Sequence, residues 1–291
     1  MEEIVNYLSH LDLDWENAPF LADLYAVENP LIVERLCGFI HVLRAGHAWL
    51  IGNNLLPYRV EAQMVRDYRL GMGDFIEARV SFCQTNKCPA VQEIAREEQK
   101  RYADIKGVRP SRKNNTVTLG TKVLIVADKT FDRIENIKTM CGELKEITKV
   151  ALLIEESKES VEYLTGVCSE VFLTEAGFDM KKQVLLALYA LFSAQKRAAN
   201  GENVVFFVDN LSKLFRVYNR NVSEGMEVSA AALGDLKTFY SSNKALEGGG
   251  SLTIVGYINK PISAQEQMLY DEFSDLANEI YNHSQHPATQ R

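Results

Sequence analysis

No stretch of this sequence approaches the run of about 18 consecutive apolar residues that a membrane-spanning helix requires. The first residues, Met1, Glu2 and Glu3, are acidic and no apolar signal core follows them, so we expect a protein that is not exported. Cysteines are few and odd in number, five in 291 residues. We expect them to be free thiols in a reducing cytoplasm.

Motifs of several enzyme classes are missing as well. Cys83 and Cys88 are the only closely spaced cysteines, and no further Cys/His pair completes a zinc site with them. The five histidines do not have metal-ligand spacing, so no metal site is expected. Neither a Gly-x-Ser-x-Gly nucleophile motif nor a Rossmann glycine fingerprint is present. These absences argue against a zinc enzyme, an α/β-hydrolase and a dinucleotide-binding enzyme.

The charge is unevenly distributed along the chain. Residues 1–35 have one Arg against eight Asp/Glu, a net charge of −7, and residues 116–291 have 18 Lys/Arg against 23 Asp/Glu, a net charge of −5. Residues 36–115 have 13 Lys/Arg against 8 Asp/Glu, a net charge of +5. The middle segment is therefore the only basic part of the molecule, which fits either a nucleic-acid contact or a solvated basic face.

The first part of the chain predicts a short acidic helical segment, residues 1–36, followed by a small β-barrel and a linker, residues 37–115. Short predicted strands at 38–43, 47–51 and 74–82 are separated by Gly-rich turns, which is typical of a barrel. Residues 95–115 predict a helix running into a linker. His47, Trp49 and Arg59 suit base stacking and phosphate contacts, although a barrel core containing Trp49 is an equal alternative.

From about residue 116 the pattern changes to alternating strands and helices. The expected strands are 121–127, 149–155, 170–174, 203–208 and 251–258, and the expected helices are 131–147, 158–165, 179–199, 228–243 and 264–273. This alternation predicts an α/β domain, 116–291, with a mostly parallel sheet covered by helices on both faces. Asp209 follows the strand 203–208, where an acid could hold the Mg²⁺ of a nucleotide or cap the next helix.

Several blocks in this half resemble the transcription termination factor Rho family. The run VVFFVDNLSKLFRVYN at 204–219, the strand VALLIEE at 150–156 and the turn EGGGSLTI at 247–254 are similar to Rho blocks in the same order. The resemblance extends to GHAWL at 46–50 and LGMGD at 70–74 in the barrel. It implies a ring-shaped hexamer in which an OB-fold barrel binds single-stranded RNA and a RecA-type domain hydrolyses ATP.

The resemblance also assigns roles to individual residues, and the sequence departs from several of them. Glu156 falls where the family glutamate polarises the attacking water. Lys129 and Thr130 remain from the phosphate (Walker A) loop, but about four residues and all glycines of that loop are absent. Ser157 replaces the arginine after the glutamate. The family's RNA-gripping lysine falls near Ala264, with Lys260 close by, and the C-terminal arginine region has no counterpart before Arg291.

These departures predict a degenerate, truncated Rho-like protein, a pseudo-ATPase in which Glu156 and Asp209 are vestigial. It would act as an RNA-binding or transcription-termination-related regulator with RNA contacts at His47, Trp49, Arg59 and Lys260. No cofactor is expected, and ATP with Mg²⁺ would bind only if the degenerate site still accepts nucleotide. The candidate partners are single-stranded RNA, further copies of the chain, an intact Rho or the transcription machinery, and no membrane. The alternatives are a protein-interaction scaffold with both ligand sites decayed and an active RNA-dependent ATPase.

Overall fold

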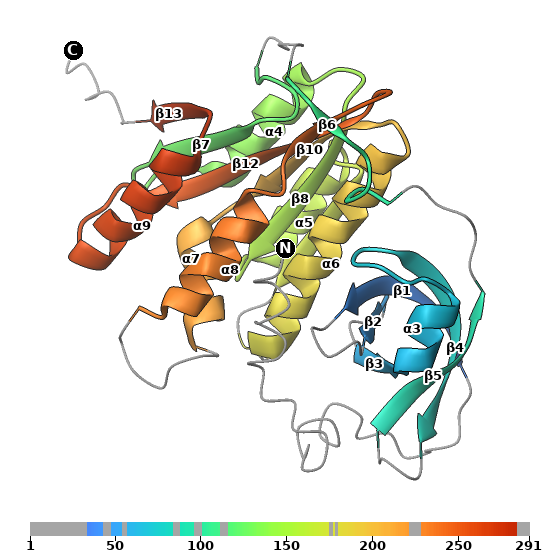
Figure 1. Cartoon of the computed structure of the whole chain (residues 1–291). Helices are drawn as coiled ribbons and strands as arrows, with labels where there is room; N and C mark the ends of the chain where they lie inside the picture. The colour runs from blue at the N-terminus through green and yellow to red at the C-terminus, as the bar shows by residue number, and fades with distance from the viewer. Residues whose placement is uncertain are drawn as a thin grey trace, which may run out of the picture. The chain divides into compact units, whose positions relative to one another are not determined.

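The computed structural model describes residues 34–42, 48–53, 57–83, 88–95, 101–110, 116–174, 177, 180–220 and 228–283. The chain divides into two compact units between Asp104 and Ile105 (Figure 1). The expected helical segment at 1–36 lies outside the described residues as far as Val33, and Glu34 already belongs to the first strand.

The first unit is a closed five-stranded barrel with the strand order β1-β2-β3-β5-β4. A short helix, α3, lies between β3 and β4 in the chain, and all neighbouring strands are antiparallel except β3 and β5. This arrangement is the five-stranded Greek-key topology of an OB-fold, so the predicted barrel is confirmed. The elements are β1 (Glu34–Val42), β2 (Ala48–Gly52), β3 (Pro57–Val60), α3 (Ala62–Asp67), β4 (Phe75–Cys83) and β5 (Cys88–Ala95).

Alternate residues of each barrel strand face inward, as the two-residue period of a strand requires. Ile40 of β1, Leu50 of β2 and Val60 of β3 lie in one buried apolar cluster and have no solvent exposure. The barrel is therefore filled mainly by aliphatic side chains, together with the ring of Tyr58.

The second unit contains an eight-stranded sheet in which β13, β7, β12, β10, β8 and β9 follow one another in parallel. The short strands β11 and β6 pair antiparallel beside β12. The strands are β6 (Gly107–Val108), β7 (Lys122–Ala127), β8 (Thr148–Ile154), β9 (Glu170–Thr174), β10 (Asn203–Val208), β11 (Lys244–Leu246), β12 (Ser251–Asn259) and β13 (Glu279–His283).

Helices cover both faces of this sheet (Figure 1). They are α4 (Arg133–Glu143), α5 (Lys158–Thr165), α6 (Met180–Ala199), α7 (Leu211–Arg220), α8 (Ala230–Tyr240) and α9 (Ala264–Leu276). Of the helices in the described ranges, none combines the length and hydrophobicity needed to cross a membrane. The predicted α/β architecture with a mostly parallel sheet is confirmed.

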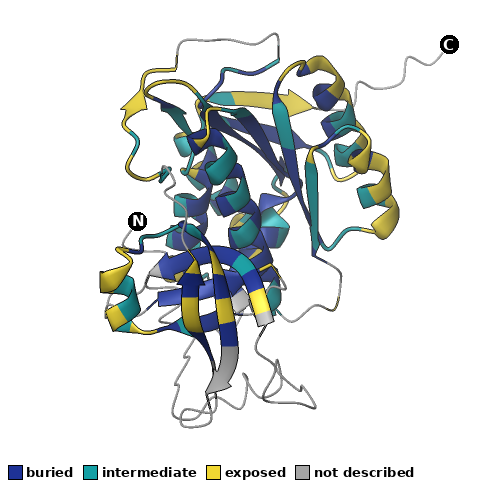
Figure 2. Cartoon of the chain, turned by 90° about the vertical axis from the view of Figure 1, so that its right-hand side faces the viewer, coloured by how far each residue is buried: buried dark blue, intermediate teal, exposed yellow. Residues whose placement is uncertain are grey.

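The central strand β10 is buried on both faces, as its uninterrupted apolar run predicts. Val205 and Phe207 pack into a core with residues of α4 and α5. Phe206 points to the opposite face, where its ring centroid lies 6.0 Å from that of Phe239 in α8. Figure 2 shows the middle of the sheet in the colour of buried residues. Burial on both sides explains why a strand in this position contains no polar residue between Val204 and Val208.

Two expectations need correction, and several short elements were not predicted. The division between the units lies before the predicted boundary near residue 116, because Gly107–Val108 forms β6 and pairs with β11 of the second sheet. The helix predicted from residue 95 is wrong over 101–110, which forms a turn followed by β6. The remaining strands and helices missed by sequence patterning are β3, α3, β5, β11 and β13, all of them short or mixed in polarity.

The turn between β11 and β12 depends on glycine for two separate reasons. Gly248 and Gly250 both have positive φ angles, 85° and 82°, which side chains other than glycine adopt at a cost. A Cβ atom at Gly250 would lie 2.3 Å from the backbone oxygen of Ala198 at the end of α6, whereas one at Gly248 would meet nothing within 4 Å. Of these two glycines, only Gly250 therefore lies against the backbone of α6.

Gly250→Ala should consequently destabilise the second unit more than Gly248→Ala does. Gly248→Ala should cost about 1 kcal/mol, the usual penalty for a left-handed alanine. Gly250→Ala should cost at least about 2 kcal/mol more, because the backbone of α6 has to shift. Urea unfolding of the two variants measures the difference, and equal midpoints would contradict the close contact.

Candidate functional site

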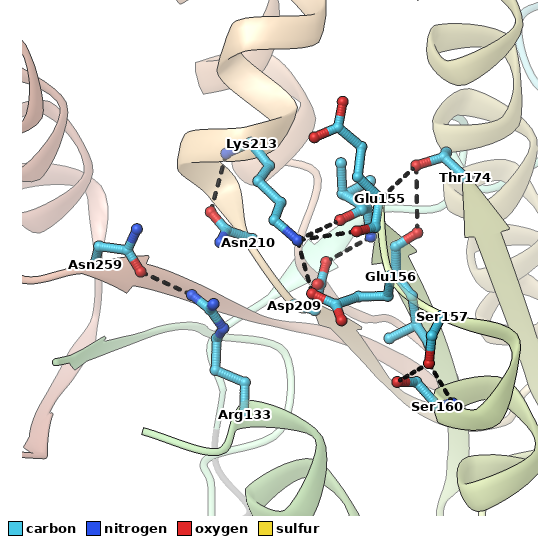
Figure 3. Close-up of polar contacts among 12 residues, drawn as sticks. Arg133, Glu155, Glu156, Ser157, Ser160, Thr174, Asp209, Asn210, Lys213 and Asn259 are labelled. Carbon is cyan, nitrogen blue, oxygen red and sulfur yellow. Dashed lines mark hydrogen bonds and ion pairs between the residues drawn. The ribbon is translucent and has the colours of Figure 1, made fainter. Parts of the chain in front are cut away.

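The carboxyl ends of the parallel strands bring together the charged residues singled out in the sequence. Glu155 and Glu156 follow β8, Asp209 follows β10, and Asn259 ends β12. Figure 3 shows these side chains with Lys213 of α7 and Arg133 of α4. We call Glu156, Asp209 and Lys213 the strand-end cluster. The predicted acids Glu156 and Asp209 therefore lie at the same edge of the sheet, the one formed by the carboxyl ends of its strands.

Asp209 is the most buried member of the strand-end cluster and has no solvent exposure. Its Oδ1 accepts a 2.8 Å hydrogen bond from the backbone N–H of Ile154, and its own N–H donates to the carbonyl of Leu152 at 3.1 Å. Its Oδ2 has no hydrogen-bond partner within the described residues. Asp209 therefore joins the ends of β8 and β10.

Burial raises the pKa of Asp209 to about 7, because the charged form loses its hydration. The hydrogen bond from Ile154 and the charges of Lys213 and Arg133 lower it, while the charge of Glu156 raises it further. Around neutral pH, burial therefore favours the protonated form of Asp209 far more than it would for a surface aspartate.

Lys213 holds the end of β8 and the acid that follows it. Its Nζ donates to the carbonyl oxygens of Ile154 at 2.9 Å and Glu155 at 3.2 Å, and it forms an ion pair with Glu156 Oε1 at 2.7 Å (Figure 3). These three acceptors match the three donors of an ammonium group. The carboxylate of Glu156 is therefore already bound by a cation of its own chain.

The backbone at Glu155 is strained, with a φ of 52°. The N–H of Glu155 donates to the carbonyl and the hydroxyl oxygen of Thr174 at 2.8 and 2.9 Å. Together with Lys213 on the carbonyl side, these bonds hold a conformation that a non-glycine residue rarely adopts. The turn that positions Glu156 is thus fixed from both neighbouring elements, β9 and α7.

The helix-capping role considered for Asp209 belongs to its neighbour. Asn210 Oδ1 accepts the backbone N–H of Lys213 at 2.9 Å, which is the bond an N-cap residue makes at the start of α7. Ser157, which stands where the family has an arginine, caps α5 by accepting from the N–H of Ser160 at 3.3 Å. Helix capping therefore accounts for Asn210 and for Ser157 without a catalytic role.

The loop between β7 and α4 contains the remaining Lys-Thr pair. It has five residues, 128–132, and turns through a 3.0 Å bond from the N–H of Phe131 to the carbonyl of Asp128. Lys129 and Thr130 are exposed on this turn. Asp132 caps α4, its Oδ1 accepting the N–H of Glu135 at 2.9 Å. A carboxylate of the chain therefore sits at the helix N-terminus where a phosphate would bind in a nucleotide-binding loop.

Arg133 is a site residue that sequence patterning missed. Its guanidinium donates to Asn259 Oδ1 at 2.7 Å and lies close enough to Asp209 to lower the pKa of that carboxyl. Asp132 and Lys213 were likewise not singled out. Spacing within the sequence gives no sign of the roles of Arg133 and Lys213, because each depends on contacts far along the chain. Asp132 instead makes a local contact with Glu135, and Asp-x-x-Glu is a spacing typical of a helix start.

Three of the four predicted RNA contacts, Trp49, Arg59 and Lys260, lie within the described residues. His47 lies outside the described residues. Trp49 is only 2% exposed, so its ring is covered in this structure. Arg59 of the barrel forms an ion pair with Glu61 at 3.4 Å. Lys260 of the second unit is 64% exposed and lies 3.9 Å from Asp128.

The outer side of β1 and β2, where Trp49 lies, is apolar and buried. Phe39 stands opposite Ile51 in the strand register and His41 stands opposite Trp49, and each of these four is at most 2% exposed. Burial lowers the pKa of His41 to about 3, so this imidazole is neutral. A face of this kind offers neither cations nor accessible rings to a nucleic acid.

No group of three His, Cys, Asp or Glu side chains is placed to hold a metal ion within the described ranges. The residues that remain from the expected nucleotide site also do not fit Mg²⁺ and a triphosphate. Glu156 is paired with Lys213, and the N-terminus of α4 is capped by Asp132.

Replacing Asp209 by Asn should alter the pH dependence of stability in a defined direction. The pKa of Asp209 is about 7 in the folded protein and about 3.8 when the group is unperturbed. The folded state therefore holds a proton that the unfolded chain has lost, and stability falls as pH rises from about 4 to about 7. Relative to Asp209→Asn, the wild type should lose on the order of a few kcal/mol over this range. Urea unfolding at several pH values measures the difference, and parallel pH profiles would contradict it.

Sequence comparison places the chain beside one group of proteins. No family model matches it. It is 28% identical over 148 residues to transcription termination factor Rho of Streptomyces coelicolor, a match that covers 49% of this chain and 36% of that protein. It is 28% identical over 171 residues to Rho of Thermotoga maritima, covering 55% of this chain and 40% of that protein. The matched part thus spans well under half of the relatives' length.

Structural comparison adds the fold. The chain superposes on an ATP synthase subunit, NeqB of Nanoarcheaum equitans, with a TM-score of 0.52 and 14% identity, covering 59% of this chain and 48% of that chain. The likeness concerns the α/β architecture alone. Over the matched half of its length, this chain is therefore similar in sequence to transcription termination factor Rho.

Proposed function

We propose that this protein is a Rho-related regulator that binds partners in transcription but does not hydrolyse ATP. The observation that carries this proposal is the position of Asp132. Its carboxylate accepts the N–H of Glu135 in the first turn of α4, so the helix N-terminus is neutralised by the chain itself. Asp128 adds a second carboxylate to the same short loop. A triphosphate would meet two negative charges and no glycine backbone to surround it.

The state of Glu156 supports the same proposal. A general base needs a free carboxylate within reach of the attacking water. Glu156 Oε1 is held at 2.7 Å by Lys213, and the side chains of both residues are less than one quarter exposed. Breaking the ion pair between Glu156 and Lys213 would leave the Lys213 ammonium with only two hydrogen-bond partners, both carbonyl oxygens. Because this ammonium is partly buried, the loss of its third partner costs free energy. The strand-end cluster therefore works as a structural clamp at the end of β8.

The burial of Trp49 favours a protein partner over RNA. Trp49 is buried, His47 lies outside the described ranges, and Arg59 forms an ion pair with Glu61. We therefore place the scaffold alternative, in which both the nucleotide and the RNA sites have decayed, ahead of an RNA-binding regulator. The partner would be a component of the transcription machinery or another copy of a Rho-related chain.

Addition of Mg·ATP should not raise the melting temperature, and RNA should not stimulate ATP turnover. Both results are expected because no cradle is available to hold the phosphates. Thermal unfolding and phosphate release measure the two quantities. A melting shift that disappears in Lys129→Ala but persists in Lys145→Ala, an exposed lysine elsewhere, would overturn the proposal.

Single-stranded RNA should bind weakly, and Arg59→Gln should leave that binding unchanged. Fluorescence anisotropy at several salt concentrations measures the affinity, and a nuclease-treated pull-down identifies protein partners. Tight RNA binding that weakens with salt and is lost in Arg59→Gln would instead support the RNA-binding regulator.

A further inference from the structure

Two cysteines that are distant in sequence meet beneath the surface of the second unit. Cys141 lies in the last turn of α4 and Cys168 lies between α5 and β9, 27 residues further along. Their Sγ atoms are 3.6 Å apart. Both side chains are buried in the core that α4 and α5 share with the sheet. Neither residue contacts the strand-end cluster through any bond in the described ranges.

The two thiols differ in their surroundings in a way that suits exchange chemistry. The S–H of Cys141, taken as the donor, hydrogen-bonds to the sulfur of Cys168. This bond and the positive charge of Lys149 lower the pKa of Cys168, against the opposing effect of burial. The same hydrogen bond, together with burial, raises the pKa of Cys141. With the hydrogen bond in this direction, Cys168 is the thiol that attacks first, and the positive charge of Lys149 favours the thiolate of either cysteine.

We propose that Cys141 and Cys168 are a latent disulfide pair that closes when the protein meets a low-molecular-weight disulfide. The Cys168 thiolate attacks one sulfur of that disulfide and expels the first thiolate, forming a mixed disulfide. Cys141 then loses its proton to solvent and attacks the Cys168 sulfur, expelling the second thiolate. The two protein thiols lose two electrons and two protons, and one small disulfide becomes two thiols.

The geometry requires only a local change. The sulfurs must approach from 3.6 Å to the length of a disulfide bond, about 2.05 Å, which side-chain rotation can supply where the backbone has room. Each cysteine has an exposed chain neighbour, Gly142 beside Cys141 and Ser169 beside Cys168. A Cβ at Gly142 would meet nothing within 4 Å, so the backbone there is open on one side. A small oxidant therefore needs only a local opening to reach the pair.

The bond would connect the end of α4 to the segment that leads into β9. A cross-link between residues 27 positions apart restricts the unfolded chain and so stabilises the folded state. For a unit of this size an unstrained disulfide raises the melting temperature by roughly 5–10 °C. The inference does not depend on the proposed function, since neither nucleotide nor RNA takes part.

The test uses the full chain with Cys37, Cys83 and Cys88 changed to Ser, which leaves only this pair. Cys83 and Cys88 have to be removed because they are register neighbours in the β4–β5 hairpin and could react independently. The protein is equilibrated in buffers of increasing oxidised-to-reduced glutathione ratio and quenched with acid. Intact mass and peptide mapping then identify the products. The matched control adds Cys141→Ala, and circular dichroism verifies that both proteins are folded.

The proposal expects a product that has lost two hydrogen masses, maps to the Cys141–Cys168 peptide pair and melts several degrees higher than the reduced protein. The Cys141→Ala control should stop at one bound glutathione on Cys168. An oxidised sample of the two-cysteine protein that contains only glutathione adducts, or only unmodified thiols, would overturn the inference.

Discussion

The hydrogen bond from the N–H of Ile154 to the carboxyl group of Asp209 is the constraint on which the candidate site depends. It fixes the end of β8 against the end of β10. Asn210, the next residue, then caps α7 and so places Lys213 one turn into that helix. From there the ammonium reaches two carbonyl oxygens and Glu156 at the end of β8. The acids of this sheet edge are therefore tied into the fold before any ligand is considered.

The central strands of the second unit were predictable because a strand buried on both faces consists of an uninterrupted apolar run. The run from Val204 to Val208 has no polar residue, and the structure places β10 within one residue of the expected limits. The barrel was recognisable from its turns, but β3 and β5 were missed. Strand β3, Pro57–Val60, has only four residues and includes Arg59. In the second unit β13 was also missed, because it is a polar edge strand whose residues are mostly exposed. Such strands are defined by their neighbours rather than by their own pattern.

The site was predictable only in part. Glu156 and Asp209 could be located because each follows a buried parallel strand, where functional residues gather. Lys213 could not, since a helix-surface lysine looks ordinary until its partners at the end of β8 are known. Trp49 illustrates a different difficulty. An aromatic residue near arginines suits either stacking on bases or packing inside the protein, and the sequence does not show that Trp49 is buried.

The central claim is that the chain itself occupies the positions where nucleotide phosphates would bind. Amide hydrogen exchange over residues 128–136, with and without a saturating concentration of Mg·ATP, measures this most directly. The loop and the first turn of α4 should exchange at the same rates in both samples, because Asp132 already satisfies the N–H of Glu135. Slower exchange in this segment when Mg·ATP is present would contradict the account.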